Sequence, residues 1–226
     1  KELVTFGIEI YETIDDYKAR INDEALSRFS VPQLEGRVRF GAPDDFGVRY
    51  LPAILSRFAA THPLVEVEVF LSTSVTLARR FEAAEIDMIL TVSARSDPAP
   101  GEVIHTEPLV WVGARDGMAF SRNPVPLALS AHGCPWRAAA LAALDRGGRR
   151  YRIAYTSEAA AGQLAAVMAD LAIAPLPRSL MGDEHRRLTG KEGFGEIGSY
   201  QLSLQKHPDI GSAGQVFAEH VRESFG

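Results

Sequence analysis

The sequence contains very little cysteine and no long apolar run, and both absences narrow the possible classes of protein. Cys134 is the only cysteine among 226 residues, which excludes an internal disulfide and a multi-cysteine metal site. A lone cysteine fits a reducing compartment, so we expect the protein in the cytoplasm. The apolar runs are far shorter than a membrane span, and we expect no membrane partner.

Clustered positive charge is also missing. The formal net charge is -5, and the Lys and Arg residues are scattered along the chain. Such a chain offers no positive field to attract a polyanion. The sequence also lacks the interleaved aromatic and basic residues that stack on bases. We therefore expect this stretch alone not to bind nucleic acid.

Patterns for catalysis, metals and cofactors are absent as well. No two histidines have the i, i+4 spacing of a helical zinc pair. There is no Gly-x-Ser-x-Gly elbow and no phosphate loop. Gly193, Gly195 and Gly198 match a Gly-x-Gly-x-x-Gly spacing, but they precede a strand-like segment instead of opening a helix, which indicates a loop. We expect no enzyme, metal or cofactor.

The first 32 residues favour a helix with a narrow apolar seam. The seam is formed by Leu3, Ile10, Ile14, Tyr17 and Ile21. A spacing near 3.5 residues suits pairing with another helix, although an ordinary amphipathic helix packed on its own domain is the alternative. The chain starts without Met or a signal pattern, so we expect a fragment of a longer protein. Pro32 ends the helix.

Alternating strands and helices follow. The expected strands are 37–41, 65–71, 86–92, 103–112, 125–129, 151–155, 173–176 and 200–205, and the expected helices are 47–61, 76–85, 135–145, 158–171 and 215–225. The β-α-β-α-β order at the start predicts a parallel sheet covered by helices. Turn formers over 114–125 indicate a crossing between two α/β units. A ligand is expected between such units, at the carboxyl ends of strands.

Several segments together resemble a known family. They are Gly36-Arg37-Val38-Arg39-Phe40-Gly41, Leu51-Pro52 through Phe58, His62-Pro63-Leu64-Val65-Glu66-Val67, Leu77 through Leu90, and Ala165 through Pro177. In this order and at this spacing, over about residues 33–225, the chain resembles the effector domain of LysR-type transcriptional regulators. The N-terminal seam resembles the end of their linker helix. Pro135-Trp136-Arg137 with residues 153–157 is similar to a branch that includes repressors of motility and exoenzyme genes.

The resemblance implies a fold, a domain order and partners. The fold would be an α/β pair of Rossmann-like lobes of the type II periplasmic-binding-protein kind, with residues 1–32 as a linker helix remnant. Regulatory lobe I would comprise 36–115 with 200–226, and regulatory lobe II would comprise 118–198. Such a domain binds a small-molecule inducer in the cleft and forms a homodimer or homotetramer. DNA would be bound only through a winged helix-turn-helix that precedes this stretch.

The resemblance also assigns candidate ligand-binding residues in the first lobe. Asp44, Asp45 and Phe46 follow the first strand, where the family faces the cleft and often offers hydroxyl groups. Here two carboxylates stand instead. Either one of them caps the following helix, or the cleft favours a cationic or hydroxyl-rich ligand.

The other candidates lie at later strand ends: Ser72, Thr73, Ser74, Arg95, His132, Cys134, Thr156, Ser157, Pro175 and Pro177. The hydroxyl groups of 72–74 either hold an anion at a helix start or act as ordinary N-caps. Arg95 is either the cation near the cleft or an exposed loop residue. Cys134 is either a small residue at a helix cap or a reactive thiol.

Two rival classes share this fold. An extracytoplasmic solute-binding protein has the same lobes, but the seam over residues 1–29 argues against it, because such proteins start close to their first strand. An enzyme on the same fold would need a constellation of acid, base or nucleophile that the sequence does not provide.

Overall fold

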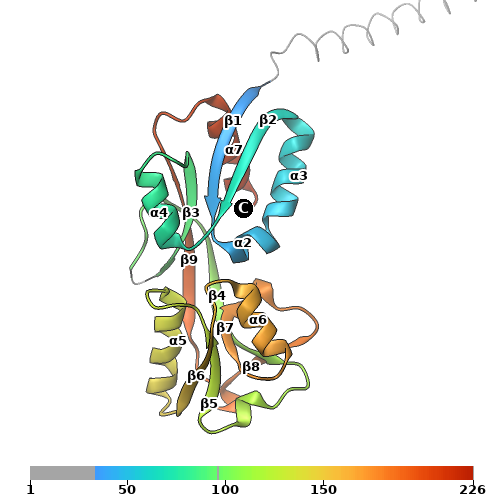
Figure 1. The fold of residues 1–226 in the computed structure, drawn as a ribbon, viewed down its shortest axis with the longest axis vertical. Coiled ribbons are helices and arrows are strands. Elements are labelled where there is room, and N and C mark those ends of the chain that lie inside the picture. Colours follow the sequence, from blue (N-terminus) through green and yellow to red (C-terminus); the bar gives the residue numbers. More distant parts are fainter. Residues whose placement is uncertain (1–33, 96, 226) are drawn as a thin grey trace, which may run out of the picture.

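The computed structural model describes residues 34–95 and 97–225. These residues form two lobes stacked along the long axis of the molecule (Figure 1). The helix expected over residues 1–32 lies outside the described residues.

Lobe I is made from the beginning and the end of the described chain. Its elements are β1 (Glu35–Ala42), α2 (Asp44–Arg49), α3 (Leu51–Thr61), β2 (Leu64–Leu71), α4 (Ser74–Glu82), β3 (Met88–Ala94), most of β9 (Gly198–Lys206) and α7 (Ser212–Glu223). The strands lie in the order β2, β1, β3, β9. Strand β1 is parallel to β2 and β3, whereas β9 is antiparallel to β3.

Helices cover both faces of the lobe I sheet. The apolar faces of α3 and α7 pack on one side, where Phe58 and Phe217 meet Phe40 of β1. Helix α4 packs on the other side through Leu77. A Cβ at Gly41 would lie 2.8 Å from Leu77 Cδ2, so only glycine lets α4 approach β1 this closely.

Lobe II is built from the middle of the chain. Its elements are the second half of β4 (Glu102–Ala114), η1 (Ala119–Ser121), β5 (Val125–Leu129), α5 (Pro135–Arg146), β6 (Tyr151–Thr156), α6 (Ala160–Met168), β7 (Ala174–Pro177), η2 (Arg178–Leu180), β8 (His185–Leu188) and η3 (Gly190–Glu192). Side chains alternate between two cores: Trp111 and Leu127 face α5, while Val112 and Ala128 face α6.

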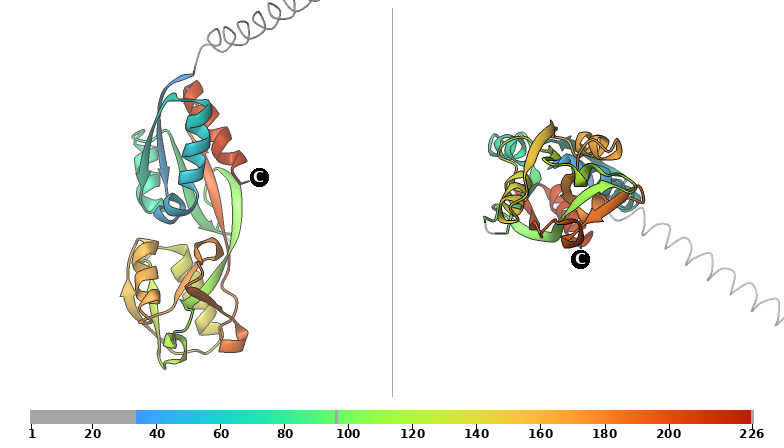
Figure 2. Two further views of the ribbon diagram at one scale, coloured as in Figure 1. Left: turned by 90° about the vertical axis from the view of Figure 1, so that its right-hand side faces the viewer. Right: turned by 90° about the horizontal axis from the view of Figure 1, so that it is seen from below.

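Strands β4 and β9 pass through both lobes and connect them along one side of the molecule (Figure 2). Glu102 pairs with Leu204 beside the lobe I core, whereas Trp111 pairs with Leu188 in lobe II. Because Leu109 already belongs to the lobe II core, we place the boundary near Pro108, earlier than the 115 expected from the sequence.

The alternating α/β pattern is confirmed, with differences that have physical causes. The sheet is mixed instead of parallel, because β9 returns from the C-terminus between β3 and β4. The helix expected over 47–61 is two helices, since Pro52 lies in the first turn of a new helix. The segment 114–125 is a turn with η1 inside lobe II and not the crossing, because turn formers mark a bend but not the core on either side. Strand β8 was not predicted.

Candidate functional site

A cavity of about 290 Å³ lies between the lobes, at the carboxyl ends of β1, β2 and β5. Lobe I lines it with the segment that follows β1 and with the start of α4. Lobe II lines it with the loop before α5 and with the start of α6. Seven candidate residues line the cavity: Asp44, Asp45, Ser72, Thr73, Ser74, His132 and Cys134.

Asp44 connects the two lobes. Its Oδ2 accepts a hydrogen bond of 3.0 Å from the backbone N–H of Ala160, the first residue of α6. Helix α6 has Ala159 at its N-cap position and no side-chain cap of its own. A carboxylate at a helix N-terminus satisfies a free amide and interacts favourably with the helix dipole. Asp44 therefore caps a helix of the opposite lobe. One alternative drawn from the sequence was that Asp44 or Asp45 caps the following helix, α2, and for Asp44 the capped helix is instead α6.

Asp45 is a half-buried carboxyl group in a negative environment. Burial, as the larger cause, and the neighbouring charge of Asp44 together raise its pKa to about 7. The backbone amides of Asp45 and Phe46 oppose this shift by hydrogen bonding to the charged form. No basic side chain of residues 34–95 and 97–225 lies within ion-pair distance of Asp45. A mixture of protonated and ionised carboxyl groups follows at neutral pH.

Phe46 lies in the core of lobe I instead of the cavity. Its side chain is 2% exposed. The ring packs against Tyr50 and Phe225, with centroid distances of 5.6 and 5.9 Å. Helix α2 therefore turns its acidic residues toward the cavity and its aromatic residue away from it.

The hydroxyl groups of Thr73 and Ser74 at the start of α4 are already engaged. Thr73 is the N-cap of α4, and its Oγ1 accepts from the backbone N–H of Thr76 at 3.4 Å. Ser74 Oγ accepts from the backbone N–H of Val92 at 3.0 Å. The capping interpretation of Thr73 is thus confirmed, while all three residues 72–74 still border the cavity.

Trp136 lies on the lobe II wall of the cavity, although the sequence did not predict it as a site residue. Its side chain is 7% exposed and lines the cavity. The indole Nε1 has no hydrogen-bond partner among the described residues. The ring packs on Tyr200 with a centroid distance of 5.1 Å. Gln163 was also missed; it lines the cavity and donates from Nε2 to the carbonyl of Ser157 at 3.1 Å.

The remaining candidates lie outside the lining. Arg95 and Thr156 are exposed, and Ser157 donates its hydroxyl to the carbonyl of Ala159 at 2.9 Å. Pro175 and Pro177 are buried in β7, where they pair with β4. Arg79 of α4, and not Arg95, is the basic residue in the cavity lining. A strand end read from sequence gives the edge of a sheet, but not the direction of each side chain.

A buried carboxylate lies where the chain passes between the lobes. Glu107 on β4 is 7% exposed. It accepts hydrogen bonds from the Ser179 hydroxyl at 3.0 Å and from the Tyr200 hydroxyl at 2.9 Å. Burial raises the pKa of Tyr200, and the charge of Glu107 raises it further, so the phenol remains a donor. Glu107 thus ties β4 to β9 and to η2.

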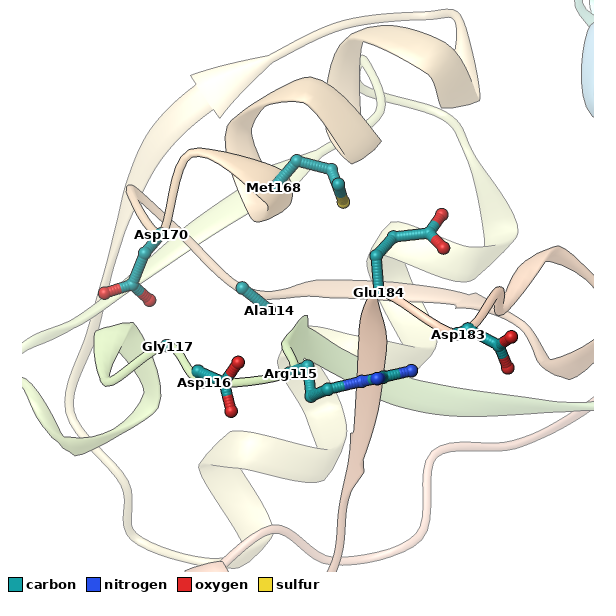
Figure 3. A pocket seen from close by; sticks show the side chains of 8 residues that line it. All are labelled: Ala114, Arg115, Asp116, Gly117, Met168, Asp170, Asp183 and Glu184. Carbon is teal, nitrogen blue, oxygen red and sulfur yellow. The ribbon is translucent and has the colours of Figure 1, made fainter.

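A second depression, of about 630 Å³, lies on lobe II (Figure 3). Its lining is rich in carboxylates, and Arg115 points toward the side on which Asp183 lies. Asp170 is structural, because its Oδ1 accepts from the backbone N–H of Ala119 at 2.8 Å. The depression belongs to one lobe only, so a ligand there would not bridge the lobes.

No cluster of three or more His, Cys, Asp or Glu side chains in residues 34–95 and 97–225 is placed to hold a metal ion. Across the same residues, none of the helices has the length and apolarity that a bilayer crossing requires.

Comparison with known proteins adds independent findings. Residues 32–226 match the family described as the LysR substrate binding domain. The HTH-type transcriptional regulator DgdR of Burkholderia cepacia is 32% identical over 206 residues, which is 90% of this chain and 69% of that protein. The HTH-type transcriptional regulator PecT of Dickeya dadantii is 28% identical over 84% of this chain and 60% of its own length.

The fold also matches solved structures. The effector binding domain of QuiR in complex with shikimate superposes with a TM-score of 0.66 at 15% identity. The match covers 85% of this chain and 98% of that domain. At this identity the likeness shows the two-lobed fold alone. The family model and the curated regulators fit a regulatory domain and not the solute-binding alternative.

Proposed function

Because the chain belongs to the LysR-type transcriptional regulators and carries their substrate-binding domain, we propose that its effector binds in the cavity between the lobes. The observation that carries this proposal is that both lobes line one cavity at the carboxyl ends of parallel strands. A ligand there contacts two bodies at once, so it binds the closed and open arrangements with different affinity. The family is one of regulators and not of enzymes.

The contact between Asp44 and α6 supports the proposal that the lobes change their arrangement when the effector binds. It joins the lobes through one hydrogen bond, from Ala160 N–H to Asp44, at the edge of the cavity. A ligand that strengthens or replaces this contact shifts the balance between closed and open forms, by as much as its affinity for the two forms differs.

The partners of the whole protein are part of the same proposal. The chain spans 69% of DgdR and 60% of PecT. We propose that DNA is bound by the winged helix-turn-helix that the sequence led us to expect outside this stretch. We also propose a cytoplasmic protein that is at least a homodimer, since most soluble oligomers are symmetric homo-oligomers. Exposed apolar residues at the free edges of both lobes, such as Leu64 and Ile153, support contacts between copies.

A thermal-shift screen of the purified chain against amino acids, polyamines, sugars and aromatic acids tests the site. A ligand that binds only the folded state at about 100 times its Kd stabilises it by about 2.7 kcal/mol. We expect Ala131→Phe, which fills the cavity, to abolish the shift. Met168→Phe adds the same ring to the depression on lobe II and serves as the matched control. A hit that survives Ala131→Phe and disappears in Met168→Phe would move the effector site to lobe II.

A further inference from the structure

Gln163 presents an unused acceptor in the wall of the cavity. The residue lies in the first half of α6 and lines the cavity, although only 3% of it is exposed. Its Nε2 donates to the carbonyl of Ser157 at 3.1 Å, and because a carbonyl only accepts, this bond fixes which end of the amide is the oxygen. Oε1 accepts no hydrogen bond from residues 34–95 or 97–225, and it is not one of their unpartnered atoms that are sealed from solvent. Because the rest of the side chain is buried, its accessible part is a fixed acceptor that faces the cavity.

The N-terminus of α5 presents the complementary groups, which are free donors. Helix α5 has 12 residues, borders the cavity through Cys134–Trp136 and has no side-chain cap. In the described part of the chain, no acceptor outside the helix receives the backbone N–H of Trp136 or of Arg137. The helix dipole strengthens these donors. The lobe II wall therefore offers donors at α5 and an acceptor at α6.

Two hydroxyl groups on the cavity wall are also available. Ser72 lies at the end of β2 in lobe I, and Ser130 follows β5 in lobe II. Among the described residues, neither Oγ has a hydrogen-bond partner, and neither is sealed from solvent. A hydroxyl group both donates and accepts, so each can pair with a hydroxyl group of a ligand in either sense. Their presence on both lobes suits a ligand with more than one hydroxyl group.

Charges of both signs line the cavity, and they disfavour a ligand that carries one net charge. Three carboxyl groups and one guanidinium group contribute: Asp44, Asp45, Glu158 and Arg79. The N-terminus of α5 adds a partial positive charge. In so small a cavity an anion would lie close to carboxylates, and a cation would lie close to the guanidinium group and the helix start. A neutral ligand avoids both costs.

We infer that the effector of this domain is a small neutral molecule with several hydroxyl groups, and that Gln163 determines this specificity by accepting a hydrogen bond from one of them. This inference rests on the proposed function, because it names the ligand class of the same cavity. Another hydroxyl oxygen of the ligand accepts from the start of α5. The volume of about 290 Å³ is close to the lower limit for small-molecule sites, about 300–1,000 Å³, and suits a sugar of five or six carbons.

Matched ligands test the class. We would titrate the purified chain with D-ribose, D-xylose and D-glucose by isothermal titration calorimetry. Each sugar is compared with its aldonate, which is negative, and with its 2-amino-2-deoxy derivative, which is positive. We expect at least one neutral sugar to bind saturably, and its two charged derivatives to bind at least about tenfold more weakly, a difference of about 1.4 kcal/mol.

Two variants of Gln163 separate recognition from a structural role. Gln163→Glu and Gln163→Met both remove the donor to Ser157, so a purely structural loss is shared by both. Only Gln163→Glu keeps an acceptor oxygen. We expect Gln163→Met to weaken sugar binding about tenfold, and Gln163→Glu to stay within about threefold of the parent. Gln215→Met is the matched control, because it also removes a hydrogen bond from a glutamine Nε2 to a backbone carbonyl, that of Ile210, but lies on α7 away from the cavity.

Three results would overturn the assignment: no neutral sugar binds at its highest soluble concentration, a charged derivative binds more tightly than its parent sugar, or Gln163→Met and Gln163→Glu bind the sugar equally well. If a different ligand from the thermal-shift screen is lost in Ala131→Phe, the cavity is still the effector site and only the ligand class is wrong. The cavity itself is wrong only if a ligand from that screen is insensitive to Ala131→Phe.

Discussion

Lobe I and lobe II each place helices on both faces of strands that end at the cavity, yet they line it with different chemistry. Lobe I contributes the carboxylates of Asp44 and Asp45 and the hydroxyl groups before α4. Lobe II contributes the start of α6, the Trp136 indole and the Gln163 amide. The carboxylate of Asp44 in lobe I and the backbone amide at the start of α6 in lobe II attract each other where the lobes meet. The hydrogen bond from Ala160 to Asp44 follows from this difference in chemistry.

The largest effect on stability should come from removing a buried aromatic side chain from the core of lobe I. Phe217 of α7 is fully buried, with ring centroids 5.4 Å from Phe40 and 4.8 Å from Phe58. We expect Phe217→Ala to lower the free energy of unfolding by about 3–5 kcal/mol. Both tryptophans lie in lobe II, so their fluorescence reports that lobe, while far-UV circular dichroism reports both.

Because β4 and β9 are shared, we expect the fluorescence transition in urea to shift together with the circular dichroism signal. Leu64→Ala, at an exposed site of lobe I, should change stability by about 0.5 kcal/mol or less. A fluorescence midpoint that stays at the parent value in Phe217→Ala would show that the lobes unfold independently.

A smaller effect should come from the carboxyl group of Asp45, and it should depend on pH. Its pKa is about 7 in the folded chain, above the ordinary value of 3.8. The folded state thus binds more protons than the unfolded state between these two values, and its stability falls as pH rises through this window. We expect Asp45→Asn to be more stable than the parent at pH 8, on the order of 2 kcal/mol, and equal to it below pH ~4.

Urea unfolding of the ligand-free chain at several pH values measures this difference. Asp209→Asn, with an exposed carboxyl group, should show no such gain at pH 8. A constant difference between Asp45→Asn and the parent at all pH values would mean that the Asp45 carboxyl group does not carry the charge penalty described for lobe I.

The smallest effect should come from the contact between the lobes. Asp44→Ala removes the acceptor for the Ala160 amide and should cost about 1 kcal/mol, as for other helix caps. Asp44→Asn keeps an acceptor oxygen and should lose less. Small-angle scattering should show a larger radius of gyration for Asp44→Ala than for the parent and Asp44→Asn. Equal scattering from all three proteins would show that the lobes are held together by other contacts.

Much of the fold was predictable because local patterns determine it. The β-branched strand 65–71 and the apolar face of the helix that carries Phe58 have a periodicity that is visible within a few residues. The mixed sheet was not predictable in this way, because β9 pairs with β3, which lies more than a hundred residues earlier in the sequence. Strand β8 was missed since His185–Leu188 is short, contains two arginines and is defined only by its pairing with β4.

The sequence predicted at which edge of the sheets the candidate site lies, but not which side chains face it. Asp44, Asp45, the 72–74 segment, His132 and Cys134 border the cavity because they follow strands that end there. Their role in binding an effector remains a prediction. Phe46, Pro175 and Pro177 lie in cores, since helix phase and strand pleat turn neighbouring side chains to opposite faces. Trp136 is the second residue of α5, beyond the end of β5, and its ring packs on Tyr200.

The path of the chain through the two lobes has a consequence for synthesis on the ribosome. Lobe II is formed almost entirely by consecutive residues, whereas the core of lobe I needs Phe217, Ala218 and Val221 from the last helix. Domains fold as their residues emerge, from the N-terminus onward. Lobe II therefore has most of its strands and helices available while lobe I still lacks helix α7, which covers one face of its sheet. A nascent chain at that stage exposes the apolar surface of lobe I that α7 covers in the complete fold.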